Sequence, residues 1–182
     1  ISACKAFEVP VISGNVSLYN ETMGEGIYPT PVIGMVGIIE KSKPYCTQWF
    51  KDDGDLILLL GDSREELGGT EYLKTIHKMV KGVPPRCDLE TEKNIQNACI
   101  SGIENGIIKS AHDCSDGGIA ITLAESCITN PKKSFGASIS LDGEIRLDTL
   151  LFGESQGRIV VSLEERDLDK FTELSKQFGV NP

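Results

Sequence analysis

The pattern of hydrophobic and polar positions predicts alternating strands and helices over the longer, second part of the chain. Leu56 to Leu60 is an unbroken apolar run closed by Gly61, which is typical of a central strand. Further strands are expected at 107–111, 137–141 and 156–163, and helices at 69–80, 88–106, 119–128 and 168–179. This alternation favours an α/β fold of the α+β type, with helices packed on a mixed sheet.

One of these helices is marked at both ends by its own residues. Asp88 is a suitable N-cap, because its side chain can accept a hydrogen bond from an amide that the helix leaves free. Ile95, Cys99 and Ile103 repeat at helical spacing and form an apolar stripe. Gly106 stands where helices commonly end in a left-handed glycine. We therefore predict an amphipathic helix between Asp88 and Gly106.

The first part of the chain has a different pattern, with glycine and proline frequent between short apolar runs. Residues 1–7 are typical of the end of a helix, which must stop before Pro10. Val11 to Ser13 is expected to form a short strand. Val32 to Ile39 is strongly β-prone and nearly continuous in apolar residues, so we predict a buried strand there.

The change of pattern places a domain boundary near residues 41–45. We expect an incomplete domain at 1–45 and an α/β domain at 46–182. The chain starts without methionine in what resembles a helix already under way, and it stops just after another, so we expect truncation at both ends. Strands at 11–39 would lack partners, and the exposed apolar surface would favour self-association.

Composition narrows the function classes. Hydrophobic residues make up 40% of the chain and charged residues 25%, as in a globular protein with a core. The net charge of -9 argues against nucleic-acid binding and against docking on an anionic membrane. No signal peptide, transmembrane run or targeting motif is visible, and the six cysteines form no CxxC pair. Disulfides stay open, but free thiols in a reduced cytoplasm fit best.

The strongest candidate for chemistry is the segment Ser110 to Gly118, where a strand ends and a helix begins. Ser115 or Asp116 can cap that helix. The two glycines that close the segment also let a ligand approach the backbone, and free amides at a helix start favour a phosphate. Asp113 and Asp116 would repel a bare phosphate, so a bridging Mg²⁺ would complete such a site. These residues alone leave a cap-and-turn and a metal–phosphate site equally open.

Three other segments carry weaker signals. Residues 14–20 form a polar loop that can bind a substrate, although a locally stabilised turn is favoured. Leu151 to Arg158 places two glycines around polar residues, as a ligand-adjacent backbone or a plain loop would. Gly68 to Glu71 is a helix start that can meet an anion but is more often a cap. Walker A and dinucleotide-binding glycine motifs are absent.

Taken together, these segments occur in an order that resembles one known family. The motifs that carry the resemblance are Ser13–Glu21, Pro29–Gly34, Leu67–Leu73, Ser110–Gly118 and Leu151–Arg158. They are similar to the later part of the synthetase subunit of phosphoribosylformylglycinamidine synthase. One such motif would be weak, whereas five in order, over essentially all 182 residues, are specific.

The resemblance implies a fold shared with aminoimidazole ribonucleotide synthetase and selenophosphate synthetase. In that superfamily an N-terminal domain contributes to a β-barrel and binds ATP, and a C-terminal domain has the α/β fold. The synthetase subunit is internally duplicated. By this resemblance, residues 1–45 end the second N-terminal-type domain and residues 46–182 form most of the second C-terminal-type domain. Cys114 stands where the family pattern suggests a small apolar residue.

The resemblance also implies a reaction. ATP activates the formamide oxygen of formylglycinamide ribonucleotide as an iminophosphate, and ammonia then displaces phosphate. The partners implied are a glutaminase subunit, which delivers the ammonia, and a small accessory subunit. Phosphoryl transfer of this kind depends on Mg²⁺ and on positioning. Family catalytic residues of the first half, including an essential histidine, lie outside this chain.

The matching motifs carry the expected site residues. Asp113 and Asp116 are the expected Mg²⁺ ligands. Residues expected to bind the nucleotide or the substrate are Gly14, Asn15, Ser17, Asn20, His112, Ser115, Gly117, Gly118, Glu154, Ser155 and Gln156. We assign no catalytic residue and expect no turnover by the chain alone. Two alternatives stay open: a non-catalytic, structural nucleotide-binding half of the same subunit, and aminoimidazole ribonucleotide synthetase.

Overall fold

The computed structural model describes residues 1–141 and 144–182, which divide into two compact units. The first unit comprises Ile1–Ser42 and the second Lys43–Pro182. No helix in the described part of the chain combines the length and the apolar character needed to cross a membrane.

The first unit contains little regular structure. Helix α1 (Ser2–Ala6) starts it, and strands β1 (Glu21–Thr22) and β2 (Glu25–Gly26) form a short antiparallel hairpin. Met23 and Gly24 connect the two strands, and both have positive φ angles, 55° and 82°. Two positive φ angles are what a tight hairpin turn with the twist of the sheet requires.

The strands predicted at 11–13 and 32–39 are wrong: both segments lack regular structure and are exposed. Val36, for example, has 96% of its surface exposed. A buried strand needs neighbours that pair with its backbone and cover its side chains, and the first unit contains no such neighbour for residues 32–39. The predicted exposure of apolar surface over residues 11–39 is confirmed.

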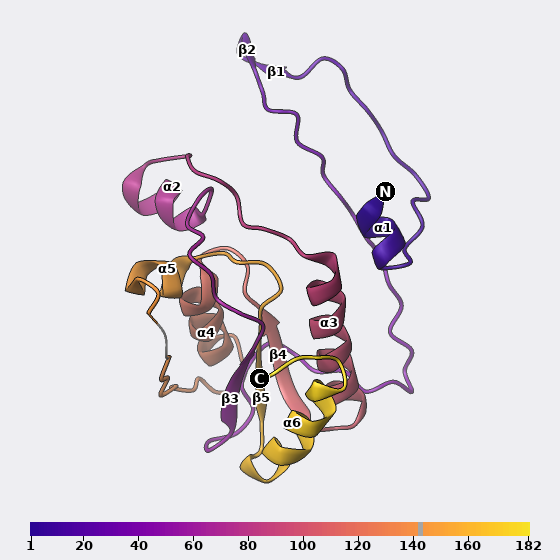
Figure 1. Ribbon diagram of the computed structural model, residues 1–182, viewed down its shortest axis with the longest axis vertical. Coiled ribbons are helices and arrows are strands. Elements are labelled where there is room, and N and C mark those ends of the chain that lie inside the picture. Colours follow the sequence, from indigo (N-terminus) through magenta and orange to yellow (C-terminus); the bar gives the residue numbers. More distant parts are fainter. Residues whose placement is uncertain (142–143) are drawn as a thin grey trace. The chain divides into compact units, whose positions relative to one another are not determined.

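The second unit is built on a three-stranded sheet of β3 (Leu56–Leu60), β4 (Ile108–Asp113) and β5 (Ile159–Leu163). Their order is β3-β5-β4, and both pairings are antiparallel. The strand predicted at Leu56–Leu60 is confirmed. The sheet is mixed only through a parallel bridge between Thr47 and Ser110 at its β4 edge, as far as the described residues show. Figure 1 shows β5 between its two neighbours.

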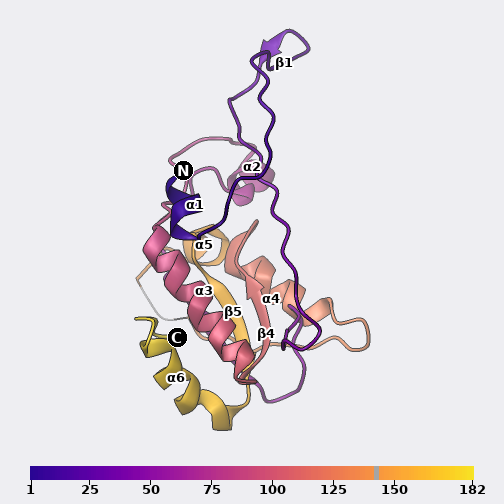
Figure 2. The same ribbon diagram turned by 90° about the vertical axis from the view of Figure 1, so that its right-hand side faces the viewer.

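Helices cover both faces of this sheet. Helices α3 (Leu89–Glu104) and α6 (Leu168–Lys176) lie on one face, and α4 (Gly118–Ile128) lies on the other (Figure 2). The predicted ends of α3 are confirmed: the Asp88 side chain accepts a hydrogen bond from the Thr91 amide at 2.8 Å, and Gly106 has a φ of 68°. The α+β fold class is therefore confirmed for this unit.

Two apolar clusters hold the layers together. The larger lies between the sheet and the helices α3 and α6, and its buried members are Leu60, Ile95, Ala98, Cys99, Ile107, Ile108, Val161, Leu163, Phe171 and Val180. The smaller lies under α4, and its buried members are Phe50, Cys114, Ile119 and Val160. Val160 and Val161 face opposite clusters, because successive side chains of a strand alternate between its faces.

Some predicted elements of this unit differ from the structure. Residues 137–141, predicted as a strand, have no regular structure. Their alternating pattern is that of a strand, but they form no ladder with the neighbouring β3 edge, and pairing defines a strand. Helix α5 (Leu147–Phe152) was not predicted, and the helix predicted at 69–80 is shorter, α2 (Glu71–His77). A 3₁₀ turn, η1 (Glu165–Asp167), precedes α6.

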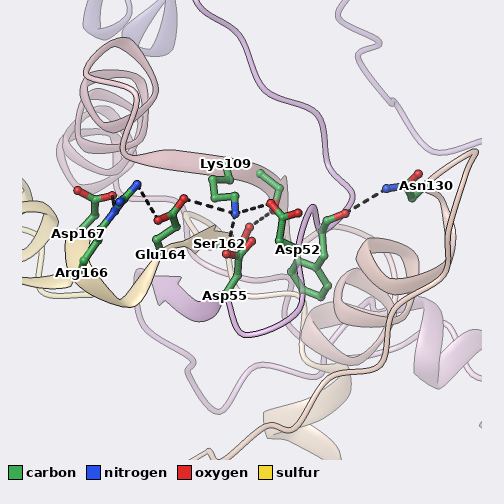
Figure 3. Close-up of polar contacts among 10 residues, drawn as sticks. Asp52, Asp55, Lys109, Asn130, Ser162, Glu164, Arg166 and Asp167 are labelled. Carbon is green, nitrogen blue, oxygen red and sulfur yellow. Dashed lines mark hydrogen bonds and ion pairs between the residues drawn. The ribbon is translucent and has the colours of Figure 1, made fainter.

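A network of ion pairs closes one end of the sheet (Figure 3). The Lys109 ammonium lies 2.7 Å from Asp55 Oδ1, 2.6 Å from Asp52 Oδ2 and 4.0 Å from Glu164 Oε1. The Asp55 side chain is only 7% exposed, and its second oxygen has no hydrogen-bond partner. Lys109 on β4 therefore neutralises a carboxylate buried at the start of β3, and it ties the loop before β3 to the residue that follows β5.

Candidate functional site

The strand-to-helix turn predicted from the sequence is formed between the end of β4 and the start of α4. Gly117 and Gly118 have φ angles of 81° and 65°, a region that residues with a Cβ rarely adopt. The Cys114 amide donates a hydrogen bond of 2.9 Å to the Arg158 carbonyl, just before β5. The sheet and these two glycines therefore fix the path of the turn, here called the 113–118 turn after its first and last residues.

His112 and Asp113 lie where β4 enters this turn. The His112 Nε2 atom lies 2.8 Å from Glu125 Oε2 on α4, and Nδ1 lies 3.5 Å from Asp113 Oδ1. The imidazole is largely buried, so it forms a polar contact between the strand and the helix that follows. This places His112 against protein groups on both of its ring nitrogens.

The two aspartates of the turn face solvent. The Asp113 side chain is 71% exposed and accepts a hydrogen bond from the Ser115 hydroxyl. This hydrogen bond lowers the pKa of Asp113, while partial burial opposes it and His112 assists it. Asp116 is exposed too. Both carboxylates are thus accessible to a ligand, and Asp113 is held in its charged form.

A magnesium ion fits these residues only with help from a ligand. Among the described residues, no group of three or more His, Cys, Asp or Glu side chains is arranged to hold a metal ion. Mg²⁺ in nucleotide sites commonly takes one or two carboxylates, with phosphate oxygens and water for the rest. Asp113 and Asp116, exposed on one turn, suit that shared arrangement and not a site made of protein groups alone.

Glu154 connects this turn to the start of α2. Its Oε1 atom accepts a hydrogen bond from the Gly117 amide at 2.9 Å and another from the Glu71 amide at 2.8 Å. One carboxylate oxygen therefore accepts hydrogen bonds from two sequence motifs, Gly68 to Glu71 and the 113–118 turn. The Gly117 amide, which a bound phosphate could use, is occupied by a group of the protein itself.

The residues around Glu154 are fixed by a buried arginine. Arg158 is 2% exposed, and its guanidinium donates to the carbonyls of Gly153 and Ser155 and to the hydroxyl of Ser63, at 2.5, 3.1 and 2.9 Å. Burial lowers the pKa of this guanidinium, and arginine keeps its charge in proteins. The Ser155 hydroxyl in turn accepts a hydrogen bond from the Arg64 amide at 3.2 Å. Ser155 and Arg158 thus join the Leu151–Arg158 motif to the loop after β3.

The glycines of the site allow close approach of protein backbone. A Cβ on Gly118 would lie 2.4 Å from the Gly153 carbonyl oxygen, and one on Gly68 would lie 2.0 Å from the Val83 carbonyl oxygen. Distances below 3.0 Å require something to shift. The sequence predicts a ligand next to the backbone at Gly118, and the α5–β5 connection lies there in the structure.

The remaining predicted site residues are Gln156 and four residues of the first unit. Gln156 is exposed, and its side chain donates to the Glu154 carbonyl at 3.2 Å. Gly14, Asn15, Ser17 and Asn20 belong to the first unit, where all four are exposed. The Ser17 hydroxyl donates to the Tyr19 carbonyl and the Asn20 amide to the Ser17 carbonyl, at 3.1 and 3.0 Å. These are local turn contacts, as the favoured interpretation of that loop predicted.

Two side chains of the site were missed by sequence reasoning. Arg158 ends the Leu151–Arg158 motif. The signal that could have identified it is its position after two glycines and at the start of a predicted strand. Glu125 carried no signal, because only the fold brings residue 125 of α4 to His112 on β4. The role of the Glu71 amide belongs to the backbone, and side-chain motifs cannot reveal it.

Comparison with known proteins shows the family to which this chain belongs. Residues 52–182 match the family model described as AIR synthase related protein, C-terminal domain. The phosphoribosylformylglycinamidine synthase subunit PurL of Caldanaerobacter subterraneus subsp. tengcongensis is 48% identical over 178 residues, which are 98% of this chain. The subunit of the same name from a Synechococcus strain is 51% identical over 168 residues, 89% of this chain. The resemblance inferred from the five motifs is therefore confirmed.

Solved structures show the same fold. The structure described as T. maritima PurL complexed with FGAR is similar with a TM-score of 0.59 and 16% identity, over 75% of this chain and 24% of that one. The structure described as T. maritima PurL complexed with ATP has a TM-score of 0.52 over 74% of this chain and 21% of that one. The chain spans about a quarter of the length of the curated relatives, 24% for the Caldanaerobacter protein and 22% for the Synechococcus protein.

Proposed function

The chain belongs to the family described as AIR synthase related protein, C-terminal domain, and from this premise we propose that it is part of a phosphoribosylformylglycinamidine synthase. The observation that carries the proposal is the 48% identity to a PurL subunit over 98% of the chain. The whole protein would join ammonia to formylglycinamide ribonucleotide with ATP. ATP phosphorylates the amide oxygen of the substrate and leaves ADP, and ammonia then displaces phosphate to give the amidine.

In this proposal the 113–118 turn contributes to binding of the nucleotide. Asp113 and Asp116 are charged and accessible, and they would hold a Mg²⁺ ion that neutralises phosphate oxygens. Ser115 holds the Asp113 carboxylate by a hydrogen bond, and His112 lies between Asp113 and Glu125. These residues would orient the ligand, which is what phosphoryl transfer mainly asks of a protein.

The domain assignment and the partners are parts of the same proposal. Residues 1–45 would end an ATP-binding, barrel-forming domain, and residues 46–182 would belong to the C-terminal-type domain. Asn15 and Ser17 would then meet the substrate from the first of these. A glutaminase subunit would deliver the ammonia, and a small accessory subunit would complete the complex. The six free cysteines agree with a reduced cytoplasm, and that location remains a prediction.

The test uses the full-length protein that carries this segment. Replacing both aspartates of the turn (Asp113→Asn, Asp116→Asn) should lower ligase activity at least about tenfold, because each lost cation contact costs transition-state stabilisation. The matched control is Asp169→Asn, an exposed carboxylate on α6, which should leave ADP release unchanged. Full activity together with unchanged nucleotide content in the double variant would refute the assignment.

One observation favours a second candidate, a structural nucleotide site. The Gly117 amide already donates to Glu154, so a group of the protein itself holds the turn in place. The turn therefore does not need to take part in catalysis to keep its conformation. In that case the double variant would lose bound nucleotide and stability, but ligase activity of protein that remains folded would persist. Measuring nucleotide content and ADP release on the same preparation separates the two functions.

The chain by itself should have no ligase activity. Catalysis needs ATP, the ribonucleotide and ammonia in one closed site, and a misplacement of about 1 Å already costs about 100-fold. Substrate-dependent ADP release by the purified chain, above a blank without protein, would contradict this expectation.

The exposed apolar residues of 11–39 should also cause self-association of the isolated chain, visible by light scattering. A monomer at high concentration would contradict this second expectation.

A further inference from the structure

Glu154 links the starts of two helices through one carboxylate oxygen. Its Oε1 atom accepts hydrogen bonds from the amides of Glu71 and Gly117, at the starts of α2 and α4. We propose that Glu154 is a positioning residue, whose single carboxylate oxygen fixes the amino-terminal ends of these two helices to each other and thereby sets the position of the 113–118 turn. This role differs from the nucleotide or substrate contact that the motif resemblance suggested for Glu154.

A carboxylate suits this place for two physical reasons. The first amides of a helix have no carbonyl partner within the helix, so each needs an acceptor from elsewhere. The partial positive charge at a helix start also favours an anion. Glu154 supplies one anion to two helix starts, and hydrogen bonds to a charged acceptor are stronger than those between neutral groups. The distances of 2.8 and 2.9 Å agree with such bonds.

The backbone that carries Glu154 is itself held in place. Arg158 donates to the carbonyls of the residues on both sides of it, Gly153 and Ser155. Gly118 lies so close to Gly153 that even a methyl group would not fit between them. The carboxylate therefore projects from a fixed segment, and a change in its length or acceptor capacity should be transmitted to the turn that bears Asp113.

The Glu71 amide can be removed almost without other change. Glu71 is the first residue of α2, a position that accepts proline because its amide has no partner in the helix. Thr70 before it has φ of -70° and ψ of 153°, the conformation that a following proline favours. Glu71→Pro deletes the amide hydrogen and the side chain, whereas the control Glu71→Ala deletes the side chain and keeps the amide.

The first experiment measures coupling in the full-length protein by urea unfolding and does not depend on any activity. With Glu154 present, Glu71→Pro should have a lower unfolding midpoint than Glu71→Ala. In the Glu154→Ala background, the two variants should differ by no more than replicates do, because the acceptor is gone. An equal difference in both backgrounds would overturn the proposal, as would no difference in either.

The second experiment measures ligase activity and rests on the proposed function. Glu154→Ala should lower kcat between about 10-fold and 100-fold through misplacement of the turn. Glu154→Gln keeps a side-chain oxygen that can accept both amides, so it should restore activity to within about threefold, with the KM for ATP near that of the unchanged protein. A glutamine variant as defective as the alanine variant, with a raised KM for ATP, would show that the charge itself meets the ligand and would overturn the positioning role. Coupling without any ligase activity would instead refute the proposed function alone.

Discussion

The two units of the chain contain similar apolar sequence, but the apolar side chains are largely exposed in the first unit and form a buried core in the second. In the first unit Val36 is 96% exposed, and in the second Phe171 is 0% exposed. Residues 32–39 have as strong a β-strand pattern as Leu56 to Leu60, yet only the latter form a strand. The difference is that β3 pairs with β5 and lies against helices, whereas residues 32–39 pair with no strand of their unit. An apolar pattern therefore indicates a segment that burial would stabilise, and the segment is buried only where other elements pack against it.

The largest effect that would sharpen this comparison is expected at Phe171. Phe171→Ala empties a fully buried position between α6 and α3 and should lower the free energy of unfolding by about 3–5 kcal/mol. Ile33→Ala in the first unit should change it by less than about 0.5 kcal/mol, since Ile33 is exposed. Urea unfolding of the chain measures both. A comparable loss in Ile33→Ala would mean that the first unit has a core of its own, and the comparison would fail.

The next largest effect is expected at Arg158, which holds polar backbone inside the second unit. Arg158→Met retains much of the volume but leaves the Gly153 and Ser155 carbonyls without their donor, so we expect a loss of about 3 kcal/mol. Arg166→Met is the matched control, because Arg166 is exposed and its ion pair with Glu164 lies at the surface. Thermal unfolding should separate the two variants clearly, and equal melting temperatures would show that the buried hydrogen bonds contribute little.

Much of the second unit could be predicted because its signals are local. The Leu56–Leu60 run, the Asp88 cap and Gly106 each depend on residues close in sequence, and all three appear as expected. The prediction of a strand at 137–141 is wrong for the opposite reason. Their alternation is a true local signal, but strand formation also depends on whether the β3 edge accepts them, and that is decided by tertiary structure.

The site could be predicted only in part for the same reason. The 113–118 turn lies within one motif, and it joins a strand to a helix as the sequence predicted. The contacts that join it to the rest are distant: Glu154 reaches both Gly117 and Glu71, and Glu125 reaches His112. Such contacts depend on the order of strands and helices in space, which a single sequence does not reveal through spacing.

A smaller effect, with a dependence on pH, is expected from the ion-pair network in Figure 3. Lys109→Met should cost about 2 kcal/mol at pH 7, because the Asp55 carboxylate would stay buried without its cation. The Lys109 hydrogen bond also lowers the pKa of Asp52 below its ordinary value of 3.8. A lowered folded-state pKa stabilises the protein above the ordinary value, and this contribution is lost as the pH falls through the folded-state pKa.

Urea unfolding of the Lys109 variant should therefore be compared with the unchanged chain at several pH values. The part of this difference that comes from the Asp52 ion pair should be full above about pH 5 and should shrink below about pH 4. Lys133→Met is the control, since Lys133 pairs with the exposed Asp53 and should have little effect at any pH. A difference that grew toward acid would show that the sign of this linkage is wrong.

The smallest effect tests whether local signals alone define an element of the second unit. The Thr70 hydroxyl accepts a hydrogen bond from the Leu73 amide at 3.3 Å and donates to the Leu67 carbonyl at 2.8 Å, so it caps α2. Thr70→Ala should cost about 1 kcal/mol, while Thr70→Ser keeps the hydroxyl and most of the stability. The control is Thr75→Ala on the exposed face of α2, expected within about 0.5 kcal/mol. If Thr70→Ala had no effect on urea unfolding, the hydrogen bond that the Glu71 amide donates to Glu154 would suffice to start α2. The start of this helix would then be set by a distant residue and not by its own sequence.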